Sequence, residues 1–550
     1  MLSSITLSFT EHDNLVLPIG GITIFVGPNN SGKSLLLKEI ESAFNTHPFP
    51  TNTLILKDYD VRWQGDAEIE KVLAQFHDSR DKNIPIGHKI IGRINPNGRR
   101  EASHIDVDNL KRIAKERQDK YWWATQFLKW GVLRLDGRSR FNLTNDQQGG
   151  DLLTAPENVL AHLFQDDCSR REVEKLVKEA FGLSFGIDPT NLGSLRIKLS
   201  REEPLADEQS LNEATRNYYK NALHIKDASD GVQAFTGIIM SVMSGNFHTI
   251  LIDEPEAFLH PPLARKLGAN LATLATKRNG ALLASTHSAD FLMGCIQATK
   301  DVRVVRLEYV EGRSRGRMVD PAELENLFKN PLMRSANAIS GLFYDGVVVC
   351  ESDNDRTFYS EIYHRLASTH KNSPSILFIN AQNKQTLKSI IEPLRKFGVP
   401  AVGIPDIDIL KEGGKVWLNL LASAQIPNAL HTGFATQRAE IKNCFERAGR
   451  DMKADGGINA LPTSDKKAAE QLLDTLTEYG IFIVPGGELE NWLLSLGTPG
   501  KKTEWTIGML ERLGLESNEL GYVPLGVDDV WGFMTKIIAW IGNPARKGVA

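Results

Sequence analysis

The chain has 550 residues, 41% of them hydrophobic and 24% charged, which is ordinary for a globular protein and too long for one hydrophobic core. The 64 Lys and Arg residues against 68 Asp and Glu give a net charge of −4, which excludes a broadly basic coat but not a local basic groove. The four cysteines are far apart and form no CxxC pair, so we expect reduced thiols rather than a disulfide framework or zinc site.

The N-terminal residues do not combine a basic stretch with a following apolar run, and no segment approaches about 18 uninterrupted apolar residues. We therefore expect a cytoplasmic protein without a signal peptide, a membrane span or a membrane partner.

The first half of the chain begins with β-strands around a turn in residues 1–26. Between about 60 and 225 the pattern is less regular, with helices expected at 107–130 and 158–182. From 229 to 310, helical and strand patterns alternate, which predicts an α/β sheet.

A second series of alternating strands and helices begins after residues 336–346 and predicts a separate, mostly parallel sheet. We place the boundary near residues 335–345 and expect domains at 1–340 and 341–550. Residues 155–225 are a candidate helical or dimerisation insertion, and the chain is expected to end in a helical extension.

The segment GPNNSGKS, residues 27–34, follows an apolar strand and precedes a helical stretch, as a phosphate-binding loop requires. Gly27 and Gly32 let the backbone amides turn toward phosphate oxygens, Lys33 reaches the β- and γ-phosphates, and Ser34 can bind Mg²⁺. The alternative is a chance match in a glycine-rich turn. The candidate nucleotide contacts of this loop are Gly27, Asn29, Asn30, Ser31, Gly32, Lys33 and Ser34.

Three later segments complete a candidate ATP site. The strand in TILIDEPEAFLHP ends in Asp253, suited to the Mg²⁺ shell, and Glu254, suited to polarising the attacking water, although an acidic helix cap has the same pattern. His287 follows the next strand and could contact the γ-phosphate, although a lone histidine is more often structural. Ser229 and Gly231 begin a helix whose amides suit phosphate, but Ser229 could be a plain N-cap.

Acidic residues in the second half follow two predicted strands. Glu351 lies at a strand tip with Asp355 four residues on, and Asp406 and Asp408 follow a later strand. The carboxyl ends of parallel strands line one crevice, and Asp406 and Asp408 share a side if the backbone stays extended, so we expect these side chains to converge. Carboxylates without His or Cys favour Mg²⁺ or Mn²⁺.

Glu488 and Glu490 follow the last predicted strand and its Gly-Gly turn, and they are further candidate metal ligands. They could instead cap a helix that follows.

The first half resembles the ABC-type ATPase heads of SMC-like proteins. Residues 27–34 match Walker A, 250–254 match Walker B, 229–233 look like a degenerate signature motif, and His287 matches the switch histidine. The resemblance implies a head-to-head homodimer or higher oligomer, because the signature of one copy completes the site of another. Gln147 and Gln148 are candidates for the Q-loop glutamine by order along the chain.

The order Glu351…Asp406-x-Asp408 resembles the Toprim domain, with Ser352 where a glycine is frequent. An ABC-type head joined to a C-terminal Toprim domain is the architecture of the overcoming-lysogenisation-defect (OLD) family, which includes the Gabija and retron-linked nucleases. The resemblance implies an α/β fold in which a P-loop ATPase domain with a helical insertion precedes a Toprim domain with a mostly parallel sheet.

The family further implies an ATP-hydrolysing, Mg²⁺- or Mn²⁺-dependent DNA endonuclease or nickase that acts in anti-phage defence. Its partners would be DNA, further copies of the chain and a defence-system component such as a retron nucleic acid or a protein encoded nearby. A basic residue would assist the metal site, with Lys384, Lys536 and Lys547 as candidates.

Other functions stay open. The Toprim-like domain could bind nucleic acid or a partner without cutting, or the protein could be an SMC-like DNA-repair ATPase, although no heptad coiled coil is visible. A topoisomerase is disfavoured because we find no tyrosine nucleophile module. The basic segment 109–123 could bind DNA phosphates and bases, or could be a solvated helix with Trp122 and Trp123 in the core.

Overall fold

The structure is a computed structural model, and it describes residues 2–9, 14–76, 84–137, 139–205, 207–310, 312–319, 321–329, 331, 337–369, 372–514 and 522–548. The chain divides into two compact units, Met1–Val26 with Asn30–Pro321 and Ala322–Ala550 with Gly27–Asn29. The predicted boundary near residues 335–345 lies later in the chain and begins in residues outside those described.

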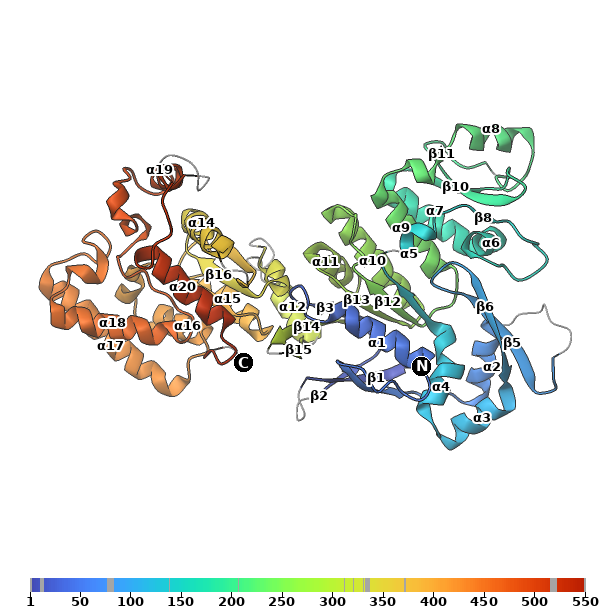
Figure 1. The fold of residues 1–550 in the computed structure, drawn as a ribbon, viewed down its shortest axis with the longest axis horizontal. Coiled ribbons are helices and arrows are strands. Elements are labelled where there is room, and N and C mark those ends of the chain that lie inside the picture. Colours follow the sequence, from blue (N-terminus) through green and yellow to red (C-terminus); the bar gives the residue numbers. More distant parts are fainter. Residues whose placement is uncertain are drawn as a thin grey trace. The chain divides into compact units, whose positions relative to one another are not determined.

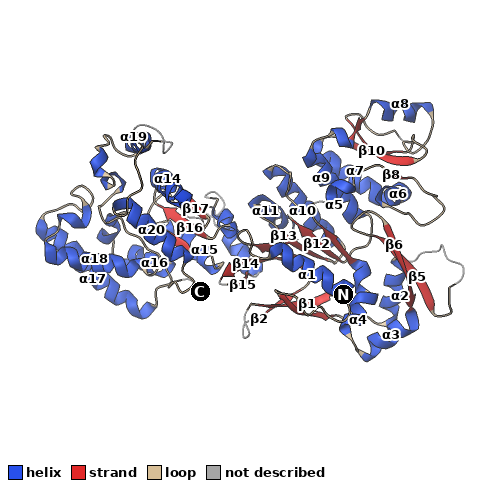
Figure 2. Cartoon of the chain, in the orientation of Figure 1, coloured by secondary structure: helices blue, strands red, loops and turns tan. Residues whose placement is uncertain are grey.

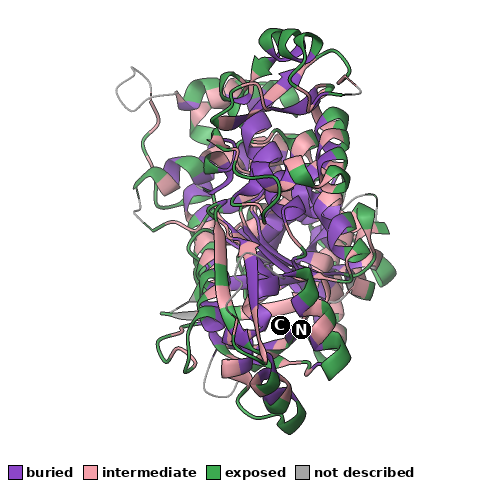
Figure 3. Ribbon diagram, turned by 90° about the vertical axis from the view of Figure 1, so that its right-hand side faces the viewer, coloured by how far each residue is buried: buried purple, intermediate pink, exposed green. Residues whose placement is uncertain are grey.

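A six-stranded sheet is the centre of the N-terminal unit, in the order β15-β14-β3-β13-β12-β7 (Figure 1). All neighbours are parallel except β15, which pairs antiparallel with β14. The interior strands are almost entirely buried, as expected for a parallel sheet covered on both faces (Figure 3). The strands are β3 (Gly21–Val26), β7 (Val132–Leu135), β12 (Thr249–Asp253), β13 (Ala281–Ser285), β14 (Val302–Val310) and β15 (Arg313–Val319).

Helices connect these strands, which confirms the predicted α/β alternation (Figure 2). α1 begins directly after the phosphate loop, and α9 is apolar nearly all round, as expected for a helix that is buried along almost its whole length. The connecting helices are α1 (Lys33–Asn45), α5 (Ser139–Asn142), α9 (Asp230–Met243), α10 (Pro261–Lys277) and α11 (Ala289–Ala298), while α12 (Pro321–Lys329) follows the last strand of this sheet.

An antiparallel layer packs against α1 through one apolar core. Its three-stranded sheet has the order β2-β1-β4, so the predicted strands of residues 1–26 are present. The basic segment 109–123 lies across α3 and α4, and Trp123 is fully buried in this core. The elements are β1 (Leu2–Ser8), β2 (Asn14–Pro18), β4 (Leu56–Val61), the hairpin β5 (His88–Ile94) and β6 (Arg100–Asp106), α2 (Asp66–Gln75), α3 (Val107–Glu116) and α4 (Lys120–Gln126).

The segment proposed as a helical insertion, residues 155–225, contains strands as well as helices. β10 pairs antiparallel with β8, β9 and β11, so a small sheet accompanies the expected helices. These strands were not expected from the sequence, although β10 alternates buried Leu195, Ile197 and Leu199 with polar residues in a strand pattern. The elements are β8 (Gln147–Gln148), α6 (Val159–Gln165), α7 (Asp167–Phe181), β9 (Ser184–Asp188), β10 (Ser194–Ser200), α8 (Glu213–Asn221) and β11 (Leu223–His224).

The C-terminal unit has a parallel sheet in the order β17-β16-β18, with residues 481–484 hydrogen-bonded along β18 as an irregular fourth strand. Its core includes the fully buried strand β16. The elements are β16 (Gly346–Cys350), α14 (Asp353–Thr369), β17 (Ile376–Asn380), α15 (Leu387–Lys396), β18 (Ala401–Ile404), α16 (Gly414–Ser423), α17 (Asn428–Ala448), α18 (Thr463–Thr477), α19 (Thr503–Leu513) and α20 (Asp529–Gly542).

Among the described residues, every helix is too short or too polar to cross a bilayer.

Candidate nucleotide and metal sites

The phosphate loop has the backbone that its glycines predict. Gly27 and Gly32 both have positive φ angles, of 140° and 94°, a conformation that residues with a Cβ rarely adopt. A Cβ on Gly32 would also lie 2.6 Å from Cδ1 of Ile55. α1 begins at Lys33, so the free amides of its first turn face the loop and provide positive potential for an anion.

Lys33, Ser34 and Asp253 are gathered at the C-terminal ends of β3 and β12. The Nζ atom of Lys33 donates to Oγ of Ser31 at 3.2 Å, and burial lowers the pKa of Lys33 to about 8. Oγ of Ser34 donates to Oδ1 of Asp253 at 2.8 Å. The two residues predicted to bind the Mg²⁺ of ATP therefore lie in direct contact.

Glu254 and His287 lie beside this group, on neighbouring strand ends. Nε2 of His287 is 3.8 Å from Oε1 of Glu254, whose side chain is 51% exposed and can reach water. Burial, reinforced by nearby Lys33, lowers the pKa of His287, so the imidazole is neutral at physiological pH. The backbone amide of His287 donates to Glu256 at 2.7 Å, which fixes the loop that carries the histidine.

The signature segment lies at the start of α9. Ser229 is the N-cap residue, but in the described part of the chain its side chain makes no capping hydrogen bond, which disfavours the plain N-cap interpretation. Gly231 packs closely against the loop after Walker B, since a Cβ there would lie 2.9 Å from the carbonyl oxygen of Phe258. The predicted contact of this segment with the nucleotide of another copy stays a prediction.

The two Q-loop candidates form strand β8. The side chain of Gln147 donates to the carbonyl of Leu143 at 3.0 Å and accepts from the amide of Leu160 at 3.1 Å, so it is engaged within the fold. Gln148 pairs with Ser194 of β10 through the backbone, and its side chain is exposed. The Q-loop role of either residue stays a prediction.

In the C-terminal unit, Glu351 and Asp406 converge as the parallel sheet predicts. Glu351 directly follows β16, Asp406 follows the neighbouring strand β18, and Cys350 and Ile404 at the strand ends are in register. The amide of Asp406 donates to Oε1 of Glu351 at 3.1 Å. One carboxylate therefore also fixes the backbone that presents the other.

Asp355 and Asp408 complete the acidic cluster by different routes. Asp355, in the first turn of α14, accepts from the amide of Ser352 at 2.9 Å, while Oγ of Ser352 accepts from the amide of Asp355 at 3.3 Å. Ser352 therefore supports the turn where glycine is frequent in Toprim domains. The chain does not stay extended after Asp406 but turns into the 3-10 helix η4 (Ile407–Lys411), which carries Asp408.

Two lysines neutralise Asp406 and Asp408. Nζ of Lys453 lies 2.6 Å from Oδ2 of Asp406 and 3.6 Å from Oδ2 of Asp408, and Nζ of Lys384 lies 3.2 Å from the same Asp408 oxygen. Lys384 was one of three lysines considered from the sequence. Lys453 was missed because it lies on a loop 45 positions after Asp408, without any local pattern.

The other two candidate lysines lie outside this cluster. Lys536 pairs with Asp474 at 3.5 Å, and Lys547 pairs with Glu478 at 2.5 Å. Both pairs are exposed to solvent.

Glu488 and Glu490 lie close enough to the cluster to affect it. Glu490 contributes to the raised pKa values of Asp355 and Asp406. The segment after Glu488 is only the 3-10 turn η6 (Leu489–Asn491), so the helix that these glutamates could cap does not form. Oε1 of Glu490 accepts from the amide of Lys502 at 2.7 Å.

Burial and mutual repulsion hold protons on this cluster. Burial, followed by the charge of Asp406, raises the pKa of Glu351 to about 8 and that of Asp355 to about 6. Burial also raises the pKa of Asp406 against the opposing effect of Lys453. Such a concentration of buried carboxylates is a favourable environment for a divalent cation.

The donor set fits Mg²⁺ or Mn²⁺, because it consists of carboxylate oxygens, and Oδ1 of Asp408 is buried without a hydrogen-bond partner among the described residues. Within that part of the chain, however, no three His, Cys, Asp or Glu side chains are close enough to hold a metal ion in their present positions. The lysine contacts with Asp406 and Asp408 occupy oxygens that an ion would use.

Two lysines of the basic segment 109–123 are held in ion pairs, while Lys115 and Arg117 are exposed. Lys111 pairs with Glu70 at 2.6 Å and Lys120 with Asp58 at 2.7 Å. The buried Trp123 ring packs against Trp63 and Phe127. These contacts favour the structural interpretation of the segment over DNA binding.

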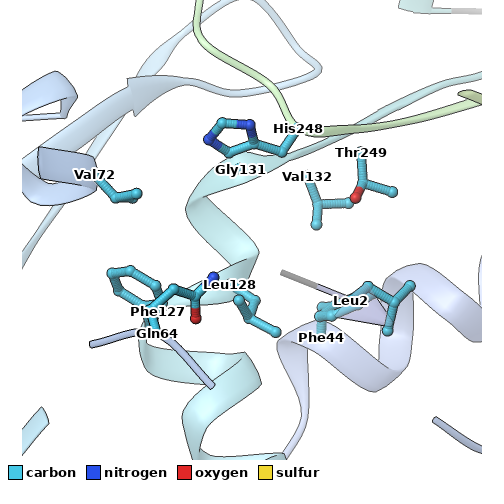
Figure 4. Close-up of a pocket in the computed structure, with 10 residues that line it drawn as sticks. All are labelled: Leu2, Phe44, Gln64, Val72, Phe127, Leu128, Gly131, Val132, His248 and Thr249. Carbon is cyan, nitrogen blue, oxygen red and sulfur yellow. The ribbon is translucent and has the colours of Figure 1, made fainter. Parts of the chain in front are cut away.

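Figure 4 shows a small, largely apolar cavity in the N-terminal unit. Val132 and Thr249, which line it, are the first residues of β7 and β12 and pair with each other. The phosphate loop follows the opposite, C-terminal end of the parallel strands. The cavity is therefore not part of the nucleotide site.

Two family models match the chain. The model described as "AAA domain, putative AbiEii toxin, Type IV TA system" matches residues 22–294. The model described as "Overcoming lysogenization defect protein-like, TOPRIM domain" matches residues 342–408, which end at Asp408. Fold and sites thus define a P-loop ATPase domain followed by a Toprim domain. This combination of matches agrees with the resemblance to the OLD family.

Two curated relatives carry the same family name. The chain is 24% identical to the Old nuclease of Escherichia phage P2 over 310 residues, 53% of this chain and 50% of that protein. It is 20% identical to the OLD nuclease of Thermus scotoductus over 448 residues, 72% of this chain and 80% of that protein. The match thus spans only half the length of the phage protein.

Solved SMC head structures show a weak likeness. The SMC head bound to the C-winged helix domain of ScpA has a TM-score of 0.34 at 13% identity, covering 60% of this chain and 99% of that chain. The SMC head domain from Thermotoga maritima has a TM-score of 0.30 at 12% identity, covering 58% and 99%. We draw no conclusion from similarity at this level.

Proposed function

We propose that the protein is an ATP-hydrolysing, divalent-metal-dependent DNA endonuclease or nickase that acts in anti-phage defence. The observation that carries this proposal is the convergence of Glu351, Asp355, Asp406 and Asp408 where β16 and β18 end. The family and the names of its nuclease relatives support the same conclusion.

The carboxylates of the cluster would hold one or two Mg²⁺ or Mn²⁺ ions, with Glu488 or Glu490 as further ligands. A bound ion would supply Lewis acidity and neutralise charge at a phosphodiester. Lys453 and Lys384, whose ammonium groups contact the aspartates, would then bind phosphate oxygens of the DNA.

In the N-terminal unit, Lys33 would bind the β- and γ-phosphates of ATP, and Ser34 with Asp253 would hold its Mg²⁺. Glu254 would polarise the attacking water, with His287 beside the γ-phosphate. Ser229 and Gly231 of a second copy would complete the site, which requires a homodimer or larger homo-oligomer.

The test is cleavage of supercoiled plasmid with Mg²⁺ or Mn²⁺, with and without ATP, by the wild type, Asp406→Ala and Lys33→Ala. We expect the wild type to nick or cut, Asp406→Ala to be inactive, and Lys33→Ala to lose ATP hydrolysis. Asp474→Ala, at an exposed ion pair away from the cluster, is the matched control and should cut as the wild type does. Equal cutting by Asp406→Ala would refute the proposed site.

A second candidate function is favoured by the lysine contacts. Because Lys453 and Lys384 already neutralise Asp406 and Asp408, the domain could bind nucleic acid or a partner without cutting. In that case the plasmid stays intact under every metal and nucleotide condition, while a gel-shift assay with the same DNA still shows binding.

A further inference from the structure

Arg140 is a fully buried cation next to the backbone of the candidate ATP site. It lies on the short helix α5, which follows β7. Its Nη2 atom donates to the carbonyl oxygens of Asp253 at 2.8 Å and Glu254 at 2.9 Å. Nε donates to the carbonyl of Asp136 at 3.3 Å, which fixes the guanidinium in place. Arg140 therefore holds the backbone of the two Walker B carboxylates without using their side chains.

The backbone of Glu254 needs such support. Its φ angle is 47°, in the left-handed region that residues with a side chain rarely adopt. Strained residues of this kind persist only where the surrounding structure holds them. The amide of Glu254 donates to the carbonyl of Ser285 at 2.9 Å, and its carbonyl accepts from Arg140. Arg140 therefore helps to fix the position of the catalytic carboxylate by holding the carbonyl group of Glu254.

Arg140 is also in contact with α9, the helix that begins with the signature segment. A Cβ on Gly237, in the middle of α9, would lie only 2.1 Å from the carbonyl oxygen of Arg140. The backbones of α5 and α9 therefore touch at this point, and only glycine permits the approach.

The start of α9 makes a second contact with the same region. Gly231 packs against the carbonyl of Phe258, and the Phe258 ring packs edge-on against Phe141, the neighbour of Arg140, at 5.0 Å. Phe258 has a φ angle of 70°, so this loop too is held in an unfavoured conformation. α9, α5 and the Walker B loop form one packed group, in which a shift of α9 must move its neighbours.

We propose that Arg140 is a positioning residue that couples the signature segment Ser229–Gly231 to Glu254 of the same chain. The inference rests on the proposed hydrolysis of ATP by paired heads. When the nucleotide of a second copy binds the start of α9, the displacement of α9 is passed through the Gly237 contact to Arg140 and so to the Asp253–Glu254 peptide. The two ATP sites of a dimer would then respond to one another.

The experiment is a double-mutant cycle in the full-length chain, using Arg140→Met, Ser229→Arg and the double variant. Equilibrium dialysis gives the Kd of ATP with Mg²⁺, and steady-state kinetics give kcat and KM. We expect Arg140→Met to lower kcat about tenfold or more with the Kd changed less than about threefold, because the hydrogen bonds of its guanidinium within the described residues go to backbone carbonyls. Arg140→Lys, which keeps a cationic donor, should recover part of kcat.

Coupling predicts that the two substitutions are not additive: the double variant should be no slower than Ser229→Arg alone. Additive losses, or an unchanged kcat in Arg140→Met, would overturn the inference. A wild type that hydrolyses no ATP would overturn the proposed function and the coupling together. Hydrolysis that is insensitive to Ser229→Arg would refute hydrolysis by paired heads.

Gly237→Ala keeps the inference testable if Arg140→Met does not fold. This substitution adds one methyl group at the α5–α9 contact and should lower kcat. Combined with Ser229→Arg, it should cause no loss beyond that of Ser229→Arg alone. Gly433→Ala, on α17 where a Cβ meets nothing within 4 Å, is the control and should behave as the wild type. Wild-type kcat in a folded Gly237→Ala variant would contradict the coupling.

Discussion

Individual residues of the acidic cluster experience opposing electrostatic effects. Burial and neighbouring carboxylates raise the pKa values of Glu351 and Asp355, which favours their neutral forms. Lys453 opposes the raised pKa of Asp406 by direct contact, and Lys384 places a second positive charge against the carboxylate of Asp408. Because the lysines are fewer than the carboxylates, the cluster still attracts further positive charge.

The first prediction concerns pH. The folded-state pKa of Glu351, about 8, lies above its ordinary value of 4.5, so the folded protein binds this proton more tightly than the unfolded chain. The resulting stability is fully present below about pH 4.5 and is lost as pH rises through about 8. In EDTA, urea denaturation should therefore give a free energy of unfolding for the C-terminal unit that falls by a few kcal/mol over this range.

Glu351→Gln should remove most of this pH dependence, because the amide does not titrate. Glu470→Gln, at a weak exposed ion pair, should keep it. Identical pH profiles for Glu351→Gln and the wild type would contradict the assignment.

The second prediction separates metal binding from catalysis. Lys453→Met should lower the plasmid-nicking rate about 10²-fold, as the loss of a charge-stabilising donor commonly does. Its affinity for Mn²⁺ in calorimetric titration should stay equal or rise, because Asp406 and Asp408 lose a competing cation. Lys536→Met, at an exposed pair, should match the wild type in both assays. Loss of Mn²⁺ binding with an unchanged nicking rate would contradict this role.

At the scale of elements, the helices α16 to α18 explain how Lys453 reaches the site. The chain leaves the sheet after β18, forms these helices and returns to the sheet at residues 481–484. These residues run along β18, with hydrogen bonds from the amide of Phe482 to the carbonyl of Gly403 at 2.9 Å and from the amide of Val484 to the carbonyl of Pro405 at 3.1 Å. The loop between α17 and α18 is thereby brought to the end of β18. This loop carries Lys453.

Arg395 on α15 provides the third prediction. It is fully buried and donates to the carbonyls of Ala401, Ala424, Tyr479 and Gly548, which joins four segments of the C-terminal unit. Arg395→Met would leave these carbonyls without their donor and should cost about 3–5 kcal/mol of unfolding free energy in urea denaturation. Lys396→Met, next along the helix and exposed, should cost under about 0.5 kcal/mol. Equal stability of the two variants would refute this role.

On the scale of the whole molecule, Lys33, Ser34, Asp253 and Glu254 belong to one compact unit and the acidic cluster to the other, and each unit has its own core. Substitutions that lie in separate cores and share no partner usually act independently. The fourth prediction is that Asp406→Ala hydrolyses ATP within about twofold of the wild-type rate while its nicking activity is lost. Loss of ATP hydrolysis in a folded Asp406→Ala protein would show that the sites are energetically linked.

Much of this architecture follows from local sequence patterns. The phosphate loop, Asp253, His287, Glu351 and Asp406 each follow a short apolar strand, and parallel strands bring such ends to one edge. The small sheet of β8 to β11 was not predicted. β8 and β11 have two residues each and are too short to show a period, whereas the alternation of β10 was a strand signal that we missed. The turn after Asp406 was not predicted either, because tertiary contacts replace the expected extended backbone with η4.

The sequence by itself determined the two domains, their order and the carboxylates and phosphate loop at the strand ends, because those features are encoded within a few neighbouring residues. Only the tertiary structure showed that Lys453 joins Asp406, and that Arg140 lies behind Asp253 and Glu254. Both cations come from segments remote in sequence. Their positions depend on how loops return to the sheet, and no local period or spacing records that.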